Sequence, residues 1–409
     1  MQDLRARAVR IFQAGVAAAD PYEGVRQALQ SNPLARVEGT VFVIAFGKAA
    51  RRMAEAALAT LAAPGPVLVV TNYENAAPLK GARVMAAGHP VPDENGAAAA
   101  RAVLELLARA GTRDQVLALI SGGGSALLPA PVAGVTLADK AAVSAALLAS
   151  GADITQINLV RQQLSRLKGG GMARAAAPAR CRALILSDVV GDDLRAIASG
   201  PTAPPLGGPA EARAVLRARG VWDRLPASVT RVLAHVQPAL PPLPEVVNQL
   251  IGSNRQSIAA MAAAAPGADV CPTPLVGDVS DACTRILDFA RQPGTFLFGG
   301  ETTVTLRGDG RGGRNQELAL RLAMQAQSAG WQGDWVFLSG GTDGRDGPTD
   351  AAGGLVDAGT LTRLRAAGLD AAALLARNDS YTALKAAGDL LTSGPTGTNV
   401  ADLQVLIRR

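Results

Sequence analysis

The chain has 409 residues, of which 48% are hydrophobic and 18% are charged, and its formal net charge is +6. This composition is typical of a globular protein with a large core, and the length indicates two or three domains. The basic residues are mostly single arginines spread along helical segments, with no long cluster and little aromatic interleaving, so we expect no nucleic-acid partner. A modest positive field would suit a small anionic substrate, although an arginine-rich surface accounts for it equally well.

The three cysteines and two histidines form neither a disulfide pattern nor a metal pattern. We therefore expect a reducing, cytoplasmic environment. The first residues lack a secretion signal, and no stretch reaches the roughly 18 uninterrupted apolar residues of a membrane span. These features predict no membrane partner, and they are compatible with the formation of a homo-oligomer.

The chain opens with an amphipathic helix that we expect to run through Ala19. Short apolar runs then alternate with alanine-rich helical stretches, which argues for a parallel sheet covered on both faces. The predicted strands of this first part are Val41–Ala45, Val67–Thr71, Val84–Ala87, Val116–Ile120 and Ala183–Leu186.

Four prolines within Val236–Pro244 predict a linker or an irregular crossing, and we place the domain boundary there, dividing the chain into residues 1–238 and 239–409. The predicted fold class is α/β in both parts. A helix over Asn315–Ala329 is closed by Gly330. The predicted strands of the second part are Val247–Ile251, Thr295–Phe298, Thr302–Leu306, Trp335–Ser339 and Leu403–Ile407.

Lys48 follows the glycine turn after the first strand, and we expect a helix to begin there. Helix N-termini present free N–H groups, and a lysine adds a full charge to an anion site. A lone Gly-Lys pair is a weak signal for an anion site, and a lysine on the surface of a first helical turn explains the pair slightly better. Only five lysines occur in the chain, however, so a lysine in a glycine-bearing motif stands out.

A glycine loop follows the strand Val116–Ile120 and has the sequence Ser121, Gly122, Gly123, Gly124, Ser125. Three glycines allow close approach to a ligand and aim several N–H groups at it. A strand followed by such a loop is how many α/β proteins hold phosphate, and this interpretation is favoured over a flexible turn.

Acidic residues follow the strand that ends at Leu186, namely Asp188, Asp192 and Asp193. Carboxylates at the carboxyl end of a strand suit magnesium, which prefers oxygen ligands and arrives with nucleotide phosphates. We assign Asp188 and Asp192 to the predicted metal site. Asp192 and Asp193 could equally start a helix, since acids are favoured in a first turn.

Glycine-rich polar loops also occur in the second part. Arg314 stands at a loop–helix junction, where its planar fork could pair with a carboxylate or phosphate. Residues 308–313 formally match G-x-G-x-x-G, but the acidic residue expected to end the next strand is missing. We expect nucleotide contacts from Gly300, Glu301, Thr342 and Asp343, because a purely structural loop seldom needs so many special residues.

His89 lies in a proline-held turn and is kept as a candidate for the substrate cleft, although a single loop histidine is more often structural. The chain contains no Walker A sequence, no G-x-S-x-G elbow and no zinc signature.

Together these motifs resemble the glycerate 2-kinases, that is, the class II glycerate kinases with a C-terminal MOFRL domain. The resemblance runs nearly end to end. It is carried by AFGKAA at 45–50, GHPVPDENG at 88–96, SGGGSALL at 121–128, SGADITQIN at 150–158, LSRLKGG at 164–170, LSDVVGDDL at 186–194, IASGPT at 197–202, IGSN at 251–254, GGRNQELAL at 312–320, GGTDGRDGPTDAAG at 340–353, NDSY at 378–381 and GPTGTNV at 394–400.

The resemblance implies a Rossmann-like first domain, a smaller α/β second domain and an active site in the cleft between them. It also implies ATP-dependent phosphoryl transfer to D-glycerate, usually giving 2-phosphoglycerate, with a divalent metal such as Mg²⁺. Lys48 and Arg314 would contact the substrate or the moving phosphoryl group, and Asp188 would hold metal or accept the hydroxyl proton. Ala401 departs from the pattern, since an asparagine often follows GTNV in that family.

Two other functions stay open. A hydroxypyruvate reductase using NAD(P)H is supported only by the glycine match at 308–313. A non-catalytic sensor of sugar phosphates could use the same loops, although the many acidic residues favour metal–nucleotide chemistry.

Overall fold

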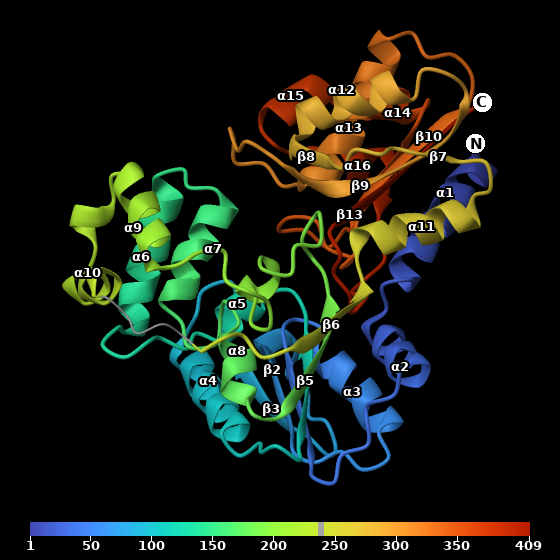
Figure 1. Ribbon diagram of the computed structural model, residues 1–409. Coiled ribbons are helices and arrows are strands. Elements are labelled where there is room, and N and C mark those ends of the chain that lie inside the picture. The colour runs from blue at the N-terminus through green and yellow to red at the C-terminus, as the bar shows by residue number, and fades with distance from the viewer. Residues whose placement is uncertain (236–240) are drawn as a thin grey trace. The chain divides into compact units, whose positions relative to one another are not determined.

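A computed structural model of the protein describes residues 1–235 and 241–409 (Figure 1). The chain forms two compact units. The N-terminal unit comprises residues 21–187 and 191–251, and the C-terminal unit comprises residues 1–20, 188–190 and 252–409. The predicted boundary at residue 238, and the first five residues of the predicted linker, lie outside the described residues. The observed division differs from the prediction: it falls between Ile251 and Gly252, and the first helix belongs to the C-terminal unit.

The N-terminal unit is built on a six-stranded sheet with the strand order β3-β2-β1-β4-β5-β6. The pairs among β1 to β5 are parallel, which confirms the Rossmann-like prediction. β4 is buried at every residue, and its sequence after Gln115 is a continuous apolar run, as expected for a strand covered on both faces. The strands are β1 (Val41–Phe46), β2 (Val67–Asn72), β3 (Arg83–Ala87), β4 (Gln115–Ile120), β5 (Arg180–Leu186) and β6 (Val246–Gly252).

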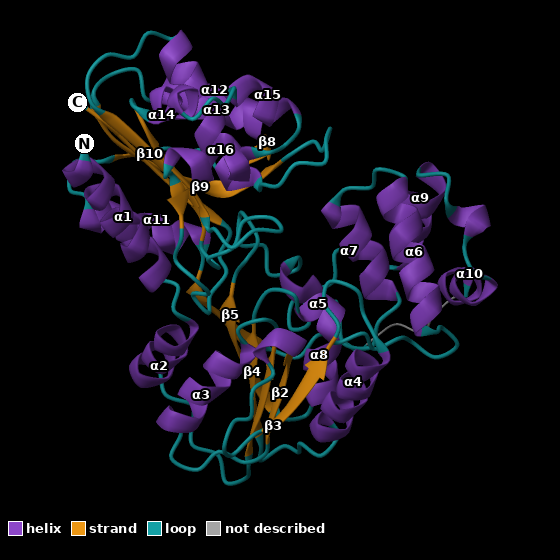
Figure 2. Cartoon of the chain, turned by 180° about the vertical axis from the view of Figure 1, so that it is seen from behind, coloured by secondary structure: helices purple, strands orange, loops and turns teal. Residues whose placement is uncertain are grey.

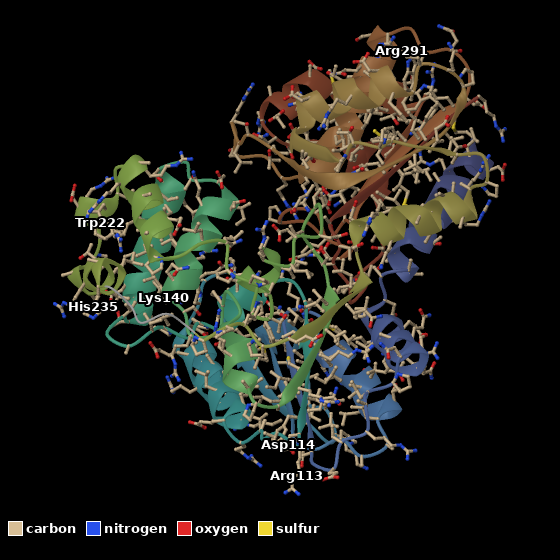
Figure 3. The ribbon with its side chains drawn as sticks, in the orientation of Figure 1. Arg113, Asp114, Lys140, Trp222, His235 and Arg291 are labelled. Atoms are coloured by element: carbon tan, nitrogen blue, oxygen red, sulfur yellow. The ribbon has the colours of Figure 1, made fainter. Side chains whose placement is uncertain are left out.

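The strand order of this sheet reverses between β1 and β4. In open α/β sheets, ligands bind outside the carboxyl ends of the strands at such a switch point. The turn that carries Lys48 follows β1, and the loop Ser121–Ser125 follows β4. The fold therefore brings these two motifs to one edge of one sheet. Figure 3 labels Asp114, which lies next to the opposite, amino-terminal end of β4.

Helices cover both faces of this sheet. Figure 2 shows α2 and α3 on one side of the strands and α4 and α8 on the other. A separate helical layer of α6, α7, α9 and α10 has its own apolar core, which includes Val143, Val160, Leu216 and Leu233. The helices of the unit are α2 (Pro21–Ser31), α3 (Ala50–Thr60), α4 (Glu94–Leu107), α5 (Gly124–Leu127), α6 (Leu137–Ala149), α7 (Ile154–Gln163), α8 (Gly171–Ala176), α9 (Pro209–Ala218) and α10 (Ala227–Ala234), with short 3₁₀ turns at Tyr73–Asn75, Ile197–Ser199 and Trp222–Arg224.

The C-terminal unit contains a second, mixed sheet with the order β12-β11-β10-β13-β9-β7. β9, β10, β11, β12 and β13 pair antiparallel, whereas β7 and β8 pair with β9 in parallel. The strands are β7 (Asp269–Val270), β8 (Leu275–Asp278), β9 (Gly294–Thr303), β10 (Trp335–Gly341), β11 (Gly353–Asp357), β12 (Leu390–Leu391) and β13 (Asp402–Arg408).

Side chains of the second sheet alternate between two cores, as the two-residue period of a strand requires. Phe296 and Phe298 face a core formed with α12 to α16, while Leu297 between them faces α1 and α11. The helices of this unit are α1 (Gln2–Ala17), α11 (Asn254–Ala264), α12 (Val279–Phe289), α13 (Arg314–Ser328), α14 (Thr360–Ala366), α15 (Ala371–Ala376) and α16 (Ser380–Ala387).

The first helix, α1, is held to this unit by apolar and ionic contacts. Leu4, Ile11 and Phe12 are buried in the core shared with β13. The guanidinium group of Arg5 pairs with Asp389 at 3.0 Å and with Asp357. The amphipathic helix expected at the start of the chain is therefore present and ends at Ala17. It packs against the sheet of the C-terminal unit, whose strands lie far from it in the sequence.

One predicted strand is wrong. The sequence predicts separate strands at Thr295–Phe298 and Thr302–Leu306, but β9 is a single strand that ends at Thr303. Its first part pairs with β13 and its last part with β8, so the two glycines between the predicted strands continue the ladder. Across the described part of the chain, no helix is both long and apolar enough to span a membrane.

Candidate functional site

The turn after β1 and the loop after β4 are bonded to each other. The backbone N–H of Lys48 donates to the carbonyl oxygen of Gly122 at 2.9 Å, and the N–H of Ala49 donates to Ser121 Oγ at 3.1 Å. The helix expected to begin at Lys48 begins instead at Ala50. The N–H groups of this turn therefore hold the glycine loop and are not free to bind a ligand.

Gly47 permits the close approach of these two segments. Its φ is +118°, and a Cβ at this position would lie 2.2 Å from Ser121 Oγ and 2.5 Å from the carbonyl oxygen of Ser121. Only glycine fits both the backbone conformation and the space. The glycine of the first motif thus serves the packing of one loop on the other.

The loop Ser121–Ser125 keeps its own N–H groups available. Within the described residues, no hydrogen bond is found for the backbone N–H of Gly122, Gly123, Gly124 or Ser125. Ser121 differs, because its N–H donates to the carbonyl oxygen of Phe46 and its side chain is buried. Four consecutive free N–H groups form a concentration of partial positive charge that suits an anion.

Lys48 and His89 both touch this loop. A Cβ at Gly123 would lie 3.0 Å from His89 Cδ2 and 3.3 Å from Lys48 Cγ. Burial and the charge of Lys48 lower the pKa of His89 below its usual range, with Glu74 opposing the shift. His89 is therefore neutral near pH 7, and the full positive charge beside the loop comes from Lys48.

A buried polar cluster lies under the loop. Ser125 Oγ is 2.9 Å from Ser199 Oγ, and Ser199 Oγ donates to Asn158 Oδ1 at 3.0 Å. The ammonium group of Lys168 donates to the carbonyl oxygen of Ser125 at 2.7 Å. Sequence reasoning gave no role to Lys168, although it is one of the few lysines and stands in a glycine-bearing motif.

The acidic segment after β5 does not start a helix. Asp188 and Asp192 are half-buried and both have interaction partners. Asp193 is paired with Arg195 at 2.8 Å on the surface. Among the described residues, no group of three or more His, Cys, Asp or Glu side chains could hold a metal. The assignment of Asp188 and Asp192 to a metal stays a prediction.

Arg314 in the C-terminal unit is already paired with two carboxylates. Its Nε and Nη2 donate to Asp402 at 2.6 and 3.0 Å, and Nη1 lies 3.0 Å from Glu301. Asp402 is fully buried, and this burial raises its pKa to about 6 despite the nearby guanidinium. Burial alone would lower the pKa of Arg314, but pairing with Asp402 and Glu301 raises it. Three of its five N–H hydrogens are used, which leaves two for a ligand.

Two residues predicted to bind nucleotide have structural roles. Gly300 lets β8 approach β9, since a Cβ there would lie 2.2 Å from the carbonyl oxygen of Leu275. Thr342 is fully buried: its hydroxyl donates to the carbonyl oxygen of Ala401 at 2.7 Å and accepts the N–H of Val400. Nucleotide contact by Gly300 and Thr342 stays a prediction that these placements disfavour. Asp343 is half-exposed, and its carboxylate accepts the N–H of Arg345 at 3.0 Å.

Asp346 in the same polar loop caps α13. Its carboxylate accepts the N–H groups of Asn315 at 3.1 Å and Gln316 at 2.8 Å, and also Gln316 Nε2 at 3.0 Å. A Cβ at Gly313 would lie 2.3 Å from the carboxyl carbon of Asp346. Several of the special residues in this loop therefore build the helix start that presents Arg314.

The glycine match at residues 308–313 is packed against the protein. A Cβ at Gly310 would lie 2.5 Å from the carbonyl oxygen of Arg377, and one at Gly312 would lie 2.2 Å from Ser380 Oγ. These glycines are required by the neighbouring segment 377–380. They do not form an open dinucleotide loop.

The predicted site residues therefore form two groups. Lys48, His89 and the loop Ser121–Ser125 lie together in the N-terminal unit, and Glu301 lies with Arg314 in the C-terminal unit. The expectation of one active site between two domains stays a prediction. Sequence reasoning missed Asp402, Asp346 and Lys168, whose partners are distant in the chain.

Known proteins match this chain along nearly its whole length. A family described as a domain of unknown function, DUF4147, matches residues 7–234, and the MOFRL family matches residues 294–402. A D-glycerate 2-kinase of Thermotoga maritima is 41% identical over 98% of each chain. A protein of Agrobacterium vitis, provisionally named a hydroxypyruvate reductase, is 42% identical over 99% of this chain and 95% of its own. The crystal structure of a T. maritima glycerate kinase matches with a TM-score of 0.92 and 40% identity, over 100% of each chain.

Proposed function

The chain belongs to the glycerate 2-kinase family, and on this premise we propose that it transfers the γ-phosphoryl group of ATP to the 2-hydroxyl of D-glycerate. The products would be ADP and 2-phosphoglycerate. The bond between the γ-phosphorus and the bridging oxygen breaks, a bond from phosphorus to the glycerate oxygen forms, and the hydroxyl proton leaves to a base. Such transfer depends on positioning and on charge stabilisation more than on covalent help from the protein.

The observation that carries the proposal is the set of free N–H groups from Gly122 to Ser125, with Lys48 beside them. Four donors at the switch point of a Rossmann-like sheet are suited to the phosphates of a nucleotide. In this role the loop binds and orients the triphosphate, and the ammonium group of Lys48 stabilises the charge of the moving phosphoryl group.

Mg²⁺ would be held by Asp188 and Asp192, and when bound it neutralises charge on the phosphate oxygens. Both residues offer oxygen donors after the carboxyl end of β5, and Mg²⁺ commonly binds one or two carboxylates together with substrate phosphates. This donor chemistry fits the ion. Asp188 would alternatively accept the hydroxyl proton of glycerate.

Arg314 would recognise the carboxylate of glycerate or the transferred phosphoryl group. Asp402 fixes the plane of its guanidinium from the buried side, so the remaining hydrogens are presented in one orientation. Glu301, whose side chain is 45% exposed, is the partner that a bound anion would displace from Nη1. An ion pair that orients the arginine before substrate arrives reduces the cost of ordering it in the complex.

Hydroxypyruvate reduction with NAD(P)H is the second candidate, and it rests on the name of the A. vitis relative. The glycines that would form its dinucleotide-binding loop are packed directly against residues 377–380. We therefore favour the kinase reaction. A sensor of sugar phosphates would bind its ligand without Mg²⁺, whereas the kinase would bind ATP with it.

Phosphorus NMR of a mixture of the protein, ATP, MgCl₂ and D-glycerate tests the reaction and its position together. The expected result is loss of the γ-phosphate signal with growth of a 2-phosphoglycerate signal. Growth of a 3-phosphoglycerate signal would keep the kinase and reject the 2-position. Oxidation of NADH with hydroxypyruvate, without phosphoryl transfer, would replace the proposal with the reductase.

A further inference from the structure

Lys168 has the surroundings of a residue with a function at the phosphate loop. Its side chain is 6% exposed, and its ammonium group donates to the carbonyl oxygen of Ser125. No other acceptor for this group is found among the described residues, so two of its three hydrogens lack a protein partner. A buried ammonium group normally has a carboxylate partner, because leaving water is costly for a charge.

The charges that face Lys168 are themselves positive. Lys140 on α6 and Arg161 on α7 are its charged neighbours. Lys140 donates to the carbonyl oxygen of Leu164 at 3.1 Å, and Arg161 donates to Ser144 Oγ at 3.3 Å. Three cations without a described carboxylate partner raise the positive potential under the loop Ser121–Ser125.

A second anchor holds the side chain of Ser125. Ser199 has one hydroxyl hydrogen, and it is used in the bond to Asn158 Oδ1. The hydrogen between the two serines therefore comes from Ser125. Ser125 turns its hydroxyl hydrogen inward, which leaves the backbone N–H groups of the loop as its donors to a ligand.

The position of Ser199 is kept at the cost of backbone strain. Ala198 and Ser199 have φ values of +49° and +62°, in the left-handed region that is unfavourable for residues other than glycine. The carbonyl oxygen of Ser199 accepts the N–H of Gly169 at 3.0 Å and Gln162 Nε2 at 3.2 Å, which holds this conformation. The strained segment thus connects the hydroxyl under Ser125 to the glycine next to Lys168.

We propose that Lys168 is a positioning residue of the phosphate loop, which fixes the carbonyl of Ser125 from below and supplies buried positive charge to the bound triphosphate. This inference rests on the proposed role of the loop in binding ATP. It assigns the glycine loop two internal anchors, Lys168 on the backbone and Ser199 on the side chain.

The charge state of Lys168 gives a signature that a purely structural role would lack. Burial, with Lys140 and Arg161 nearby, holds the pKa of Lys168 well below its usual range. Lys168 is protonated below this lowered pKa and loses its charge as the pH rises through it. Triphosphate affinity should then fall as the pH rises through this lowered pKa, and an arginine at this position should remove that fall because it stays charged.

The experiment compares Lys168→Met and Lys168→Arg with the wild-type protein by calorimetric titration with inorganic triphosphate and by ATP-dependent kinetics. Lys168→Met should weaken triphosphate binding and raise KM for ATP by about tenfold or more. Lys168→Arg should keep most of the affinity and lose the decline of affinity with rising pH. Lys80→Met, which removes one positive charge at an exposed lysine, is the control, and its triphosphate affinity should stay within about twofold of wild type.

The outcomes separate this inference from the proposed function. A folded Lys168→Met protein that binds triphosphate as wild type does, or a loss equalled by Lys80→Met, would overturn the role of Lys168 and leave the kinase in place. Wild-type protein that binds triphosphate through Lys168 but transfers no phosphoryl group would overturn the kinase alone. If Lys168→Met does not fold, Ser199→Ala decides, because it breaks the other anchor and should also raise KM for ATP.

Discussion

The side chain of Lys48 can be removed without disturbing the loop that it touches, because the loop is held by backbone N–H groups. Lys48→Ala keeps the bonds to Gly122 and Ser121, and it deletes only the charge. We expect kcat to fall by about 100-fold or more with an unchanged melting temperature. Lys80→Ala, at an exposed lysine, is the control and should keep full activity. Near-normal turnover of Lys48→Ala would remove Lys48 from the mechanism.

Ala401 occupies a backbone conformation that alanine adopts at a cost. Its φ is +64°, and its carbonyl oxygen accepts both the N–H and the hydroxyl of Thr342, so the conformation is fixed. Asparagine tolerates the left-handed region better than alanine does. Ala401→Asn should therefore raise the free energy of unfolding by about 0.5–1 kcal/mol in urea titrations. Ala18→Asn, at φ −65°, is the control, and an equal gain there would contradict the argument.

Protonation of Asp402 should lower the activity of the enzyme and raise the stability of its fold. Its folded pKa of about 6 lies above the usual value of 3.8, so the folded protein binds this proton more tightly than the unfolded chain. As pH falls through about 6, Asp402 is protonated and Arg314 loses its bidentate partner, so kcat/KM should fall. Over the same range, linkage should raise the free energy of unfolding by on the order of 1 kcal/mol.

Asp402→Asn isolates this group from the other carboxylates. The difference in unfolding free energy between the variant and wild type, measured by urea titration from pH 4.5 to 8, should be constant above about pH 6 and should change steadily as the pH falls below it. A difference independent of pH would show that Asp402 keeps an ordinary pKa.

At the scale of elements, the strength of the local signal decided what the sequence could predict. β1 and β4 are buried along nearly their whole length, so their continuous apolar runs predicted them correctly. β11 and β12 were missed, since β11 starts with two glycines and β12 has two residues. The glycine loop Ser121–Ser125 was recognised from local spacing. Its anchors Lys168 and Ser199 were not, because they come from other segments of the chain.

The start of α13 shows the same limit and yields a prediction. The polar residues around Asp346 looked functional in sequence, yet Asp346 caps a helix that begins 32 residues earlier, at Arg314. Asp346→Ala would leave the buried N–H groups of Asn315 and Gln316 without their side-chain acceptor. The free energy of unfolding of the C-terminal unit should fall by about 2–4 kcal/mol. Asp309→Ala, at a surface ion pair, should leave it unchanged, and equal losses would contradict the capping role.

At the scale of the whole molecule, the two units are not two consecutive pieces of chain. The C-terminal unit includes residues 1–20. α1 buries Leu4, Ile11 and Phe12 in the core that also contains Leu403 and Val405. The sequence predicts this amphipathic helix but not its partner. The spacing of its apolar residues shows which face of the helix is buried, but it does not show which surface covers that face.

This arrangement predicts that residues 252–409 do not fold as a stable domain by themselves. Without α1, one face of the second sheet would expose the apolar side chains that Leu4 and Phe12 cover, and Asp357 and Asp389 would lose Arg5. A fragment of residues 252–409 should show no cooperative thermal transition, whereas the same fragment joined through a flexible linker to residues 1–20 should regain one. In the full chain, Phe12→Ala should lower the free energy of unfolding of this unit by about 3–5 kcal/mol. A cooperative transition of the bare fragment, equal to that of the joined one, would instead make α1 an accessory of a self-sufficient domain.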